Sequence, residues 1–316
     1  MDVIIQKIAS LVMSLTMLLG TASASAMLNY RAGEASSIPQ ARIVFGGDML
    51  FDRTIRVAAD AKGGDFIFSC IEPLFTDADL VVANLEGPIT ANPSVSVDSH
   101  VADGNNYTFT FPVSTAKLLY AHNVRVVNIG NNHISNFLAE GVRSTMQYLD
   151  DAGVQYFGDP FAQKTATTSI NGVRLAFVNF NQFERASTEE ITVGQIHEAR
   201  ANGFLPVVYT HWGEEYVPAT DYEKTLAHEF INAGAEMVVG SHPHVIQEHE
   251  IYAGKHIYYS LGNLFFDQYW NADVRTGLLL DVTFTKNGVR GVEERRVELE
   301  RDRRTCPIAT MPPKSE

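Results

Sequence analysis

Residues 238–245 read VVGSHPHV and place two histidines on either side of a proline, directly after an apolar run with the composition of a buried strand. The chain has only ten histidines, so two of them at i and i+2 beyond a Gly-Ser pair indicate a ligand pair more than a packed face. The alternative is a proline turn that carries incidental imidazoles. The choice between the two depends on whether other predicted strands end in similar chemistry.

Several other short runs of Val, Ile and Phe also end in polar side chains. ARIVFGGD ends at Asp48, ADLVVANLEG reaches Glu86, VRVVNIGNNH ends at His133, and LPVVYTH ends at His211. Continuous apolar runs of four to six residues are typical of strands that are buried on both faces of a sheet.

Helical patterns lie between these runs, at residues 112–123, 139–153 and 221–234. Alternation of this kind predicts an α/β domain. Asn171-Gly172 and Asn287-Gly288 are candidate hairpin turns, so we expect part of the sheet system to be antiparallel. Residues 91–107 form the longest predicted loop and are a candidate border of the site.

Composition and length define the domain organisation. With 45% hydrophobic and 19% charged residues, the chain of 316 residues has a globular composition. Residues 1–26 read as a signal peptide that ends in Ala-Ser-Ala, and an uncleaved membrane anchor is the alternative. We expect a linker at residues 27–40, one domain at residues 41–302 and a C-terminal tail at residues 303–316. The mature protein is therefore predicted to be extracytoplasmic, in the periplasm or at the cell surface.

The charge balance limits the class of partner. A formal net charge of -13 argues against a nucleic-acid partner, which would favour a basic surface. An anionic substrate would have to be bound locally, by a metal ion or by a few arginines. Cys70 and Cys306 are equally compatible with one disulfide and with two free buried thiols.

The polar residues at the strand ends form an oxygen and nitrogen donor set without a thiolate. Ligands of α/β sheets bind beyond the carboxyl ends of the strands, where these residues lie. Carboxylate, amide and imidazole donors suit divalent ions such as Zn, Mn or Fe. A carboxylate such as Glu86 can bridge two ions, and paired ions are suited to hydrolysis.

Six ordered motifs carry a family resemblance: GGDMLFDR, NLEGPIT, NNH, HWGEEY, GSHPHV and SLGNLFFDQ. Over residues 41–281 the chain resembles the CapA family of poly-γ-glutamate capsule synthesis, within the calcineurin-like metallophosphoesterase superfamily. The resemblance implies a four-layer sandwich of two mixed β-sheets flanked by helices. It also implies one or two divalent metal ions at the strand ends and a metal-dependent hydrolase or phosphoesterase type of site.

The resemblance also assigns roles to individual residues. One ion would be held by Glu86, Asn132, His211 and His242, and the other by Asp48, Glu86 and His244. His133 resembles the histidine that faces the substrate as an acid or oxyanion partner, so that His133 and Asp48 are catalytic candidates.

Two positions depart from the superfamily pattern, and three more residues are weaker candidates. Leu50 stands where a histidine ligand is usual, so a single ion or a weak second site is plausible. Asn136 stands where an aspartate is common, which affects the orientation of a histidine. Arg53 is a further catalytic candidate, as an anion contact, with an ordinary salt bridge as its alternative. Asn263 and Asp267 are predicted to support the site or shape its loop.

The sequence thus predicts a secreted CapA-like protein of envelope-polymer synthesis with a metal-dependent hydrolase site. Its partner would be an anionic polymer or a small phospho or γ-glutamyl substrate, with a membrane polymer-synthesis complex as a further possible partner. The alternative is a non-catalytic component that binds or assembles the polymer.

Overall fold

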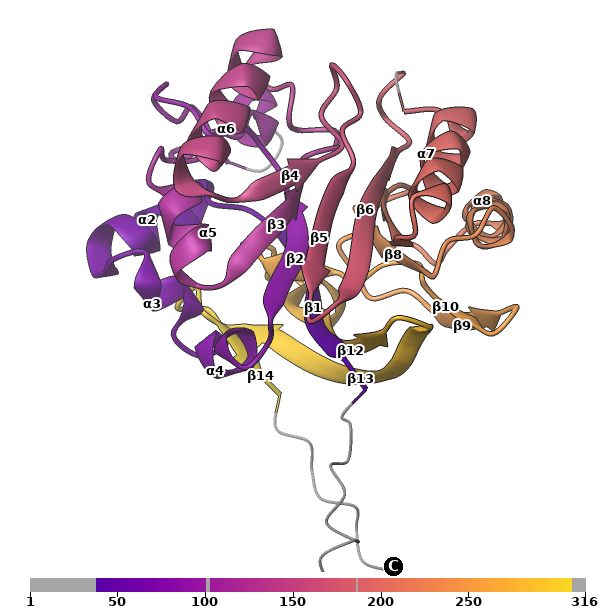
Figure 1. Cartoon of the computed structure of the whole chain (residues 1–316). Coiled ribbons are helices and arrows are strands. Elements are labelled where there is room, and N and C mark those ends of the chain that lie inside the picture. The colour runs from indigo at the N-terminus through magenta and orange to yellow at the C-terminus, as the bar shows by residue number, and fades with distance from the viewer. Residues whose placement is uncertain (1–37, 101–102, 186, 309–316) are drawn as a thin grey trace, which may run out of the picture. The chain divides into compact units, whose positions relative to one another are not determined.

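The computed structural model describes residues 38–100, 103–185 and 187–308 (Figure 1). The predicted signal peptide at residues 1–26 and most of the predicted linker lie outside the described residues. The helices and strands of the described residues belong to one compact unit, which begins at Pro39.

The first sheet is mixed. Within the described residues it holds eight strands in the order β14-β13-β12-β1-β2-β3-β4, and β11 also pairs with β1. The strands β1 to β4 are parallel, whereas β12, β13 and β14 add in antiparallel fashion. Their bounds are β1 Gln40–Met49, β2 Leu80–Leu85, β3 Val124–Asn128, β4 Gln155–Phe157, β11 Asn263–Phe265, β12 Thr276–Thr285, β13 Gly288–Leu299 and β14 Thr305–Pro307.

The second sheet has six strands within the described residues, in the order β5-β6-β7-β8-β10-β9. The four central strands are parallel, and β5 and β9 are antiparallel strands at its two edges. Their bounds are β5 Ala166–Ile170, β6 Val173–Asn181, β7 Leu205–His211, β8 Met237–Ser241, β9 His249–Tyr252 and β10 Lys255–Tyr258.

Helices cover the outer face of each sheet (Figure 1). The first sheet carries α2 Arg53–Lys62, α3 Asp65–Phe68, α4 Glu72–Thr76, α5 Thr115–Ala121 and α6 Leu138–Ala152, and the second carries α7 Glu189–Ala201 and α8 Asp221–Asn232. A short 3-10 helix, η1 Gly104–Tyr107, and α9 Ala272–Arg275 lie in loops. Three of these helices, α5, α6 and α8, were predicted from their spacing. Among the described residues, no helix combines the length and apolar character that a membrane span requires.

Successive side chains of a strand point to opposite faces of the sheet, and the continuous apolar runs arise because both faces are buried. Val82 of β2 packs between the two sheets, whereas the adjacent Val81 packs under the helices of the first sheet. In β7, Val207 likewise faces the space between the sheets, and Val208 packs in the cluster beneath α7 and α8. The predicted four-layer sandwich of two mixed β-sheets flanked by helices is therefore confirmed.

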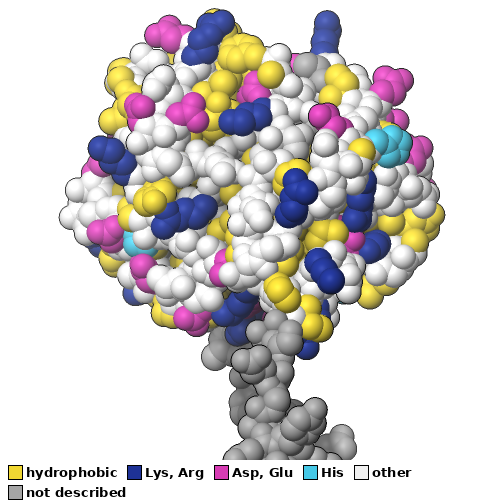
Figure 2. Space-filling view, viewed as in Figure 1, with side chains coloured by type: hydrophobic (Ala, Val, Ile, Leu, Met, Phe, Trp, Pro, Cys, Tyr) yellow, Lys and Arg dark blue, Asp and Glu magenta, His cyan; other side chains and the backbone are white. Residues whose placement is uncertain are grey.

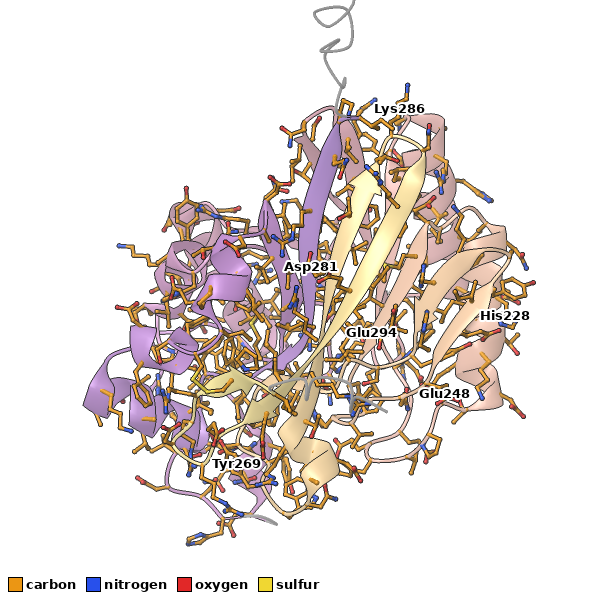
Figure 3. All side chains as sticks on the ribbon, turned by 90° about the horizontal axis from the view of Figure 1, so that it is seen from below. His228, Glu248, Tyr269, Asp281, Lys286 and Glu294 are labelled. Atoms are coloured by element: carbon orange, nitrogen blue, oxygen red, sulfur yellow. A yellow bond between two sulfur atoms is a disulfide. The ribbon has the colours of Figure 1, made fainter. Side chains whose placement is uncertain are left out.

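Tight turns connect the antiparallel strands. Asn171 and Gly172 both have positive φ, at 51° and 79°, and connect β5 to β6 as predicted. The turn between β12 and β13 contains Asn287, and Figure 3 marks its neighbour Lys286 at the tip of these strands. A third hairpin, β9 to β10, turns at Ala253-Gly254 and was not predicted.

The C-terminal end of the fold is tied to its first half. Cys70, just beyond α3, forms a disulfide with Cys306 in β14. Because β14 also pairs with β13, ordered structure extends past the predicted domain boundary at residue 302 and into the predicted tail. The segment was read as a tail because three residues of strand are too short to leave a sequence pattern.

Candidate metal centre

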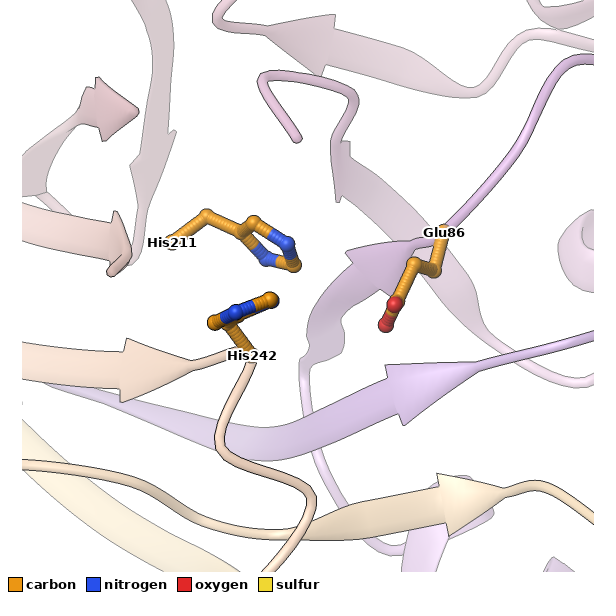
Figure 4. A group of neighbouring side chains, drawn as sticks. All are labelled: Glu86, His211 and His242. Carbon is orange, nitrogen blue, oxygen red and sulfur yellow. The ribbon is translucent and has the colours of Figure 1, made fainter. Parts of the chain in front are cut away.

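The predicted ligands meet where parallel strands of both sheets end. Asp48 lies near the end of β1, Glu86 follows β2, and Asn132 and His133 follow β3. From the second sheet, His211 is the last residue of β7, and His242 and His244 follow β8. Figure 4 shows the Glu86 carboxylate facing the rings of His211 and His242.

The donor atoms fall into two groups that share one carboxylate. Glu86, His211 and His242 bring their donors within 4.8 Å of one another, and Asp48, Glu86 and His244 form the second such group. Asn132 belongs with the first group, because its Oδ1 lies 3.0 Å from His211 Nε2. This division is the one that the resemblance implied, with Glu86 between the two positions. That these residues bind metal remains a prediction.

The two carboxylates are buried side by side. Asp48 and Glu86 are both fully inaccessible to solvent. Burial, together with the charge of Asp48, raises the pKa of Glu86 well above its usual range. Burial acts in the same direction on Asp48, but contacts from His244, His211 and Asn84 outweigh it and lower the pKa of Asp48. A cation between the carboxylates would offset this repulsion and keep both ionised.

His211 and His242 are held in the neutral form that binds metal. Burial lowers the pKa of His211 below its usual range and lowers that of His242 to about 3. Two buried atoms, Glu86 Oε1 and His242 Nδ1, have no hydrogen-bond partner among the described residues. Neutral imidazoles, paired carboxylates and unpartnered donor atoms fit a divalent ion such as Zn, Mn or Fe.

The backbone of the 238–245 stretch is bent to present its histidines. His242 and His244 have positive φ angles of 100° and 58°, a backbone region that residues other than glycine rarely adopt. Strained residues of this kind cluster at functional sites. Gly240 is required just before them, because a Cβ there would lie 1.8 Å from the carbonyl oxygen of Tyr259.

Asn84 connects the ligands and was not predicted as a site residue. Its Nδ2 donates to Asp48 Oδ1 at 2.8 Å and lies 3.3 Å from His211 Nδ1, and its Oδ1 accepts from Asn128 and Asn131. Asn84 is fully buried in β2. A polar amide inside an apolar strand, two residues before Glu86, was the signal that could have identified it.

The two departures from the superfamily pattern have clear structural outcomes. Leu50 is fully buried and packs in the apolar core beneath the helices, so it leaves the second donor group with three protein ligands. Asn136 lies beside His133, with its Oδ1 at 3.3 Å from His133 Nδ1. Because that Oδ1 also accepts from the backbone N–H of Phe109, it is an acceptor, and His133 Nδ1 carries the proton.

His244 is oriented by a similar contact. Asn263 Oδ1 lies 2.9 Å from His244 Nδ1, and Asn263 Nδ2 donates to Gln268. The predicted supporting role of Asn263 therefore agrees with its position.

Arg53 lies close to the centre but points its charge at a carboxylate. Its guanidinium forms an ion pair with Asp267 at 2.5 Å and donates to Asn106 at 3.1 Å. The guanidinium lies over the rings of Phe109 and Phe266, at 5.1 and 5.4 Å. These rings in turn contact His133 and His244. The salt-bridge alternative is therefore present, and a catalytic role for Arg53 stays a prediction.

Comparisons with known proteins agree with this geometry. A family model described as bacterial capsule synthesis protein PGA_cap matches residues 42–268. The PGA biosynthesis protein CapA of Bacillus subtilis is 31% identical over 81% of this chain and 70% of that protein. The capsule biosynthesis protein CapA of Bacillus anthracis is 30% identical over 71% of this chain, and the match spans 59% of that protein.

More distant proteins share the fold or part of the sequence. A probable polyglutamine synthesis accessory protein of Mycobacterium tuberculosis is 26% identical over 61% of this chain and 57% of that protein. A phosphatase of Mycoplasma pneumoniae has a TM-score of 0.53 at 12% identity, covering 83% of this chain and 94% of that one. A hypothetical protein of Thermus thermophilus has the same TM-score at 15% identity, covering 81% of this chain and 99% of that one. These two structures are similar to this chain in fold.

Proposed function

The chain belongs to the PGA_cap family of bacterial capsule synthesis proteins, and we propose that it acts in the synthesis or processing of an anionic γ-glutamyl envelope polymer through a metal-dependent hydrolase site. The observation that supports this proposal is the pair of donor groups that share Glu86. Two adjoining ligand sets at the strand ends suit hydrolysis better than a structural role, which usually uses thiolates.

The surface charge favours local recognition of such a polymer. Basic and acidic side chains are interspersed on the face in Figure 2, and the drawn side chains there form no single basic patch. With a net charge of -13, the protein would repel a polyanion at long range. Attraction at the metal centre would therefore determine where the polymer binds.

When bound, the metal would polarise the scissile group and stabilise developing negative charge. His133 supplies the proton transfer that hydrolysis requires. Burial lowers the pKa of His133 to about 4, so the ring is neutral at pH 7. With the proton on Nδ1, its Nε2 would relay to the leaving group the proton that the attacking water releases, because the low pKa makes the protonated ring a strong donor rather than a strong base.

We also propose an extracytoplasmic location and an association with a membrane polymer-synthesis complex. The disulfide between Cys70 and Cys306 favours an oxidising compartment, in line with the predicted signal peptide. One relative is named as an accessory protein of polyglutamine synthesis, which favours a role beside a synthase.

A non-catalytic polymer-binding function is the second candidate. The apolar packing of Leu50 supports it, because the group of Asp48, Glu86 and His244 has one donor fewer than the group that Asn132 joins. Such a centre would hold a carboxylate of the polymer through a metal ion without hydrolysing it.

Metal analysis and hydrolysis assays distinguish these functions. The purified protein would be assayed for bound Zn, Mn and Fe, and then for hydrolysis of a generic phosphodiester and of γ-glutamyl peptides. Turnover that a chelator and His211→Ala both abolish, and that the added metal restores after chelation, supports the hydrolase. Metal binding and polymer binding without turnover of either substrate would overturn the hydrolase and support the second candidate.

A further inference from the structure

A pocket of about 280 Å³ adjoins the metal centre and contains Arg53 in its wall. Asn106 and Tyr107 line one side of it, and Gln268 and Trp270, which follow β11, line the other. Tyr216 also lines the pocket and stacks against His244, with ring centroids 6.1 Å apart. A chain bound at the centre could therefore extend directly into this pocket.

The guanidinium of Arg53 is fixed in place and only partly satisfied. Asp267 holds one end of it, and Asp267 is itself fixed by the backbone N–H and hydroxyl of Thr54. Phe109 and Phe266 hold its plane, and its unpartnered Nε is itself buried. The donors left for a ligand are the second N–H groups of Nη1 and Nη2, since one N–H of each is used by Asn106 and Asp267. A planar, oriented guanidinium that keeps unused donors is suited to bind a second carboxylate.

The opposite side of the pocket offers aromatic surface. Trp270 is 58% exposed, and its ring meets that of Tyr216 edge to face at 5.4 Å. Large aromatic side chains exposed at a pocket mouth can pack against the methylene groups of a flexible ligand.

We propose that this pocket binds the γ-glutamyl unit next to the reacting bond, with Arg53 contacting its free α-carboxylate and Trp270 packing on its methylene groups. The inference rests on the proposed function and specifies its substrate. Each unit of a γ-linked chain carries one free carboxylate and two side-chain methylenes, which are the groups that the pocket accommodates. Arg53 is then a specificity residue rather than a catalytic one.

Binding of two matched oligomers tests the proposal. One probe is a γ-linked glutamate oligomer, and the other is the same oligomer with its α-carboxylates converted to carboxamides. Titration calorimetry of the metal-loaded protein should show that the carboxylate oligomer binds about 10- to 100-fold more tightly, the range expected for a hydrogen bond to a charged group. Arg53→Gln should reduce this preference by weakening only the carboxylate oligomer.

Two further variants address folding and the aromatic wall. Arg290→Gln is the matched control, because Arg290 is exposed near the start of β13 and should leave both affinities unchanged. Trp270→Ala at an exposed position should weaken both oligomers similarly, and circular dichroism checks that each variant is folded. The chain has two tryptophans, and Trp212 is fully buried, so oligomer binding should change the fluorescence of Trp270 in the wild type and not in Trp270→Phe.

Equal affinities of the two oligomers for the wild-type protein, or an unchanged preference in folded Arg53→Gln, would overturn the proposed pocket. Neither result depends on turnover. Binding that is selective for the carboxylate oligomer and depends on Arg53, but without hydrolysis, would support the pocket and overturn the hydrolase proposal. Hydrolysis without this selectivity would support the hydrolase and overturn the pocket.

Discussion

Replacing Asn84 by leucine should destabilise the protein by about 2.5 to 6 kcal/mol. Leucine has the same branched outline as asparagine but cannot form the hydrogen bonds of the amide. The loss includes the bond to the ionised Asp48, which contributes about 1.5 to 3 kcal/mol, and two neutral bonds from Asn128 and Asn131 of about 0.5 to 1.5 kcal/mol each.

Both asparagine partners keep a second acceptor, which limits the loss. Asn128 Nδ2 still reaches the carbonyl of Gly130, and Asn131 Nδ2 still reaches that of Leu85. Urea unfolding of the metal-free protein measures the effect as a lower midpoint at an unchanged slope. Asn202→Leu, at an exposed position after α7, should change the free energy of unfolding by less than about 0.5 kcal/mol.

Asn84→Asp keeps an acceptor for Asn128 and Asn131 but replaces the donor to Asp48 by a negative charge. It adds a third carboxylate beside Asp48 and Glu86, so the metal-free variant should be destabilised by like-charge repulsion. Added Mn²⁺ or Zn²⁺ should stabilise this variant more than the wild type, because a cation offsets the extra charge. A loss below about 1 kcal/mol in Asn84→Leu, or equal metal stabilisation of Asn84→Asp and the wild type, would refute the reasoning.

Replacing both Cys70 and Cys306 by serine should lower the free energy of unfolding by about 2 to 5 kcal/mol, because the disulfide closes a loop across 236 residues. Reductant should shift the urea midpoint of the wild type but not of the double variant. Leu50→His should cost about 2 to 4 kcal/mol, since it places a polar ring in an apolar core, and calorimetry should show no gain in metal affinity. Burial lowers the pKa of His249 and His256, whose rings share a 3.0 Å contact. The folded state therefore favours the neutral rings, which contribute stability above about pH 6.5, the pKa of histidine in the unfolded chain. This contribution is lost as the pH falls from there towards the lower pKa of the folded state. The urea midpoint should consequently fall less between pH 7.5 and pH 5 in His256→Gln than in the wild type.

The sequence predicted where the candidate ligands lie because a strand end is visible locally. Asp48, His211 and His242 each follow an apolar run, and the carboxyl ends of parallel strands meet at one edge of a sheet. The division into two groups around Glu86 came from the family resemblance, since spacing alone does not show which strand ends face each other. The Asn171-Gly172 hairpin was predicted for an equally local reason, its requirement for positive φ.

The remaining contacts depend on tertiary packing and leave no local signal. Arg53 and Asp267 are 214 residues apart, and their pairing requires β11 to lie beside β1. The disulfide depends on β14 reaching α3, which a three-residue strand does not reveal. Asn84 was passed over because its importance comes from partners on β1, β3 and β7 rather than from its own strand.

The first strand of the chain lies in the middle of its sheet. β1 is bordered by β2 on one side and by β12 on the other, and Gln40 pairs with Thr285, so the two neighbours are separated by most of the sequence. A nascent or C-terminally truncated chain would therefore expose one unpaired edge of β1 until β12 is available, and exposed edges of this kind promote aggregation. Folding must wait for nearly the whole polypeptide, so an expression vector that shortens the C-terminus before β12 should yield insoluble material rather than a smaller working domain.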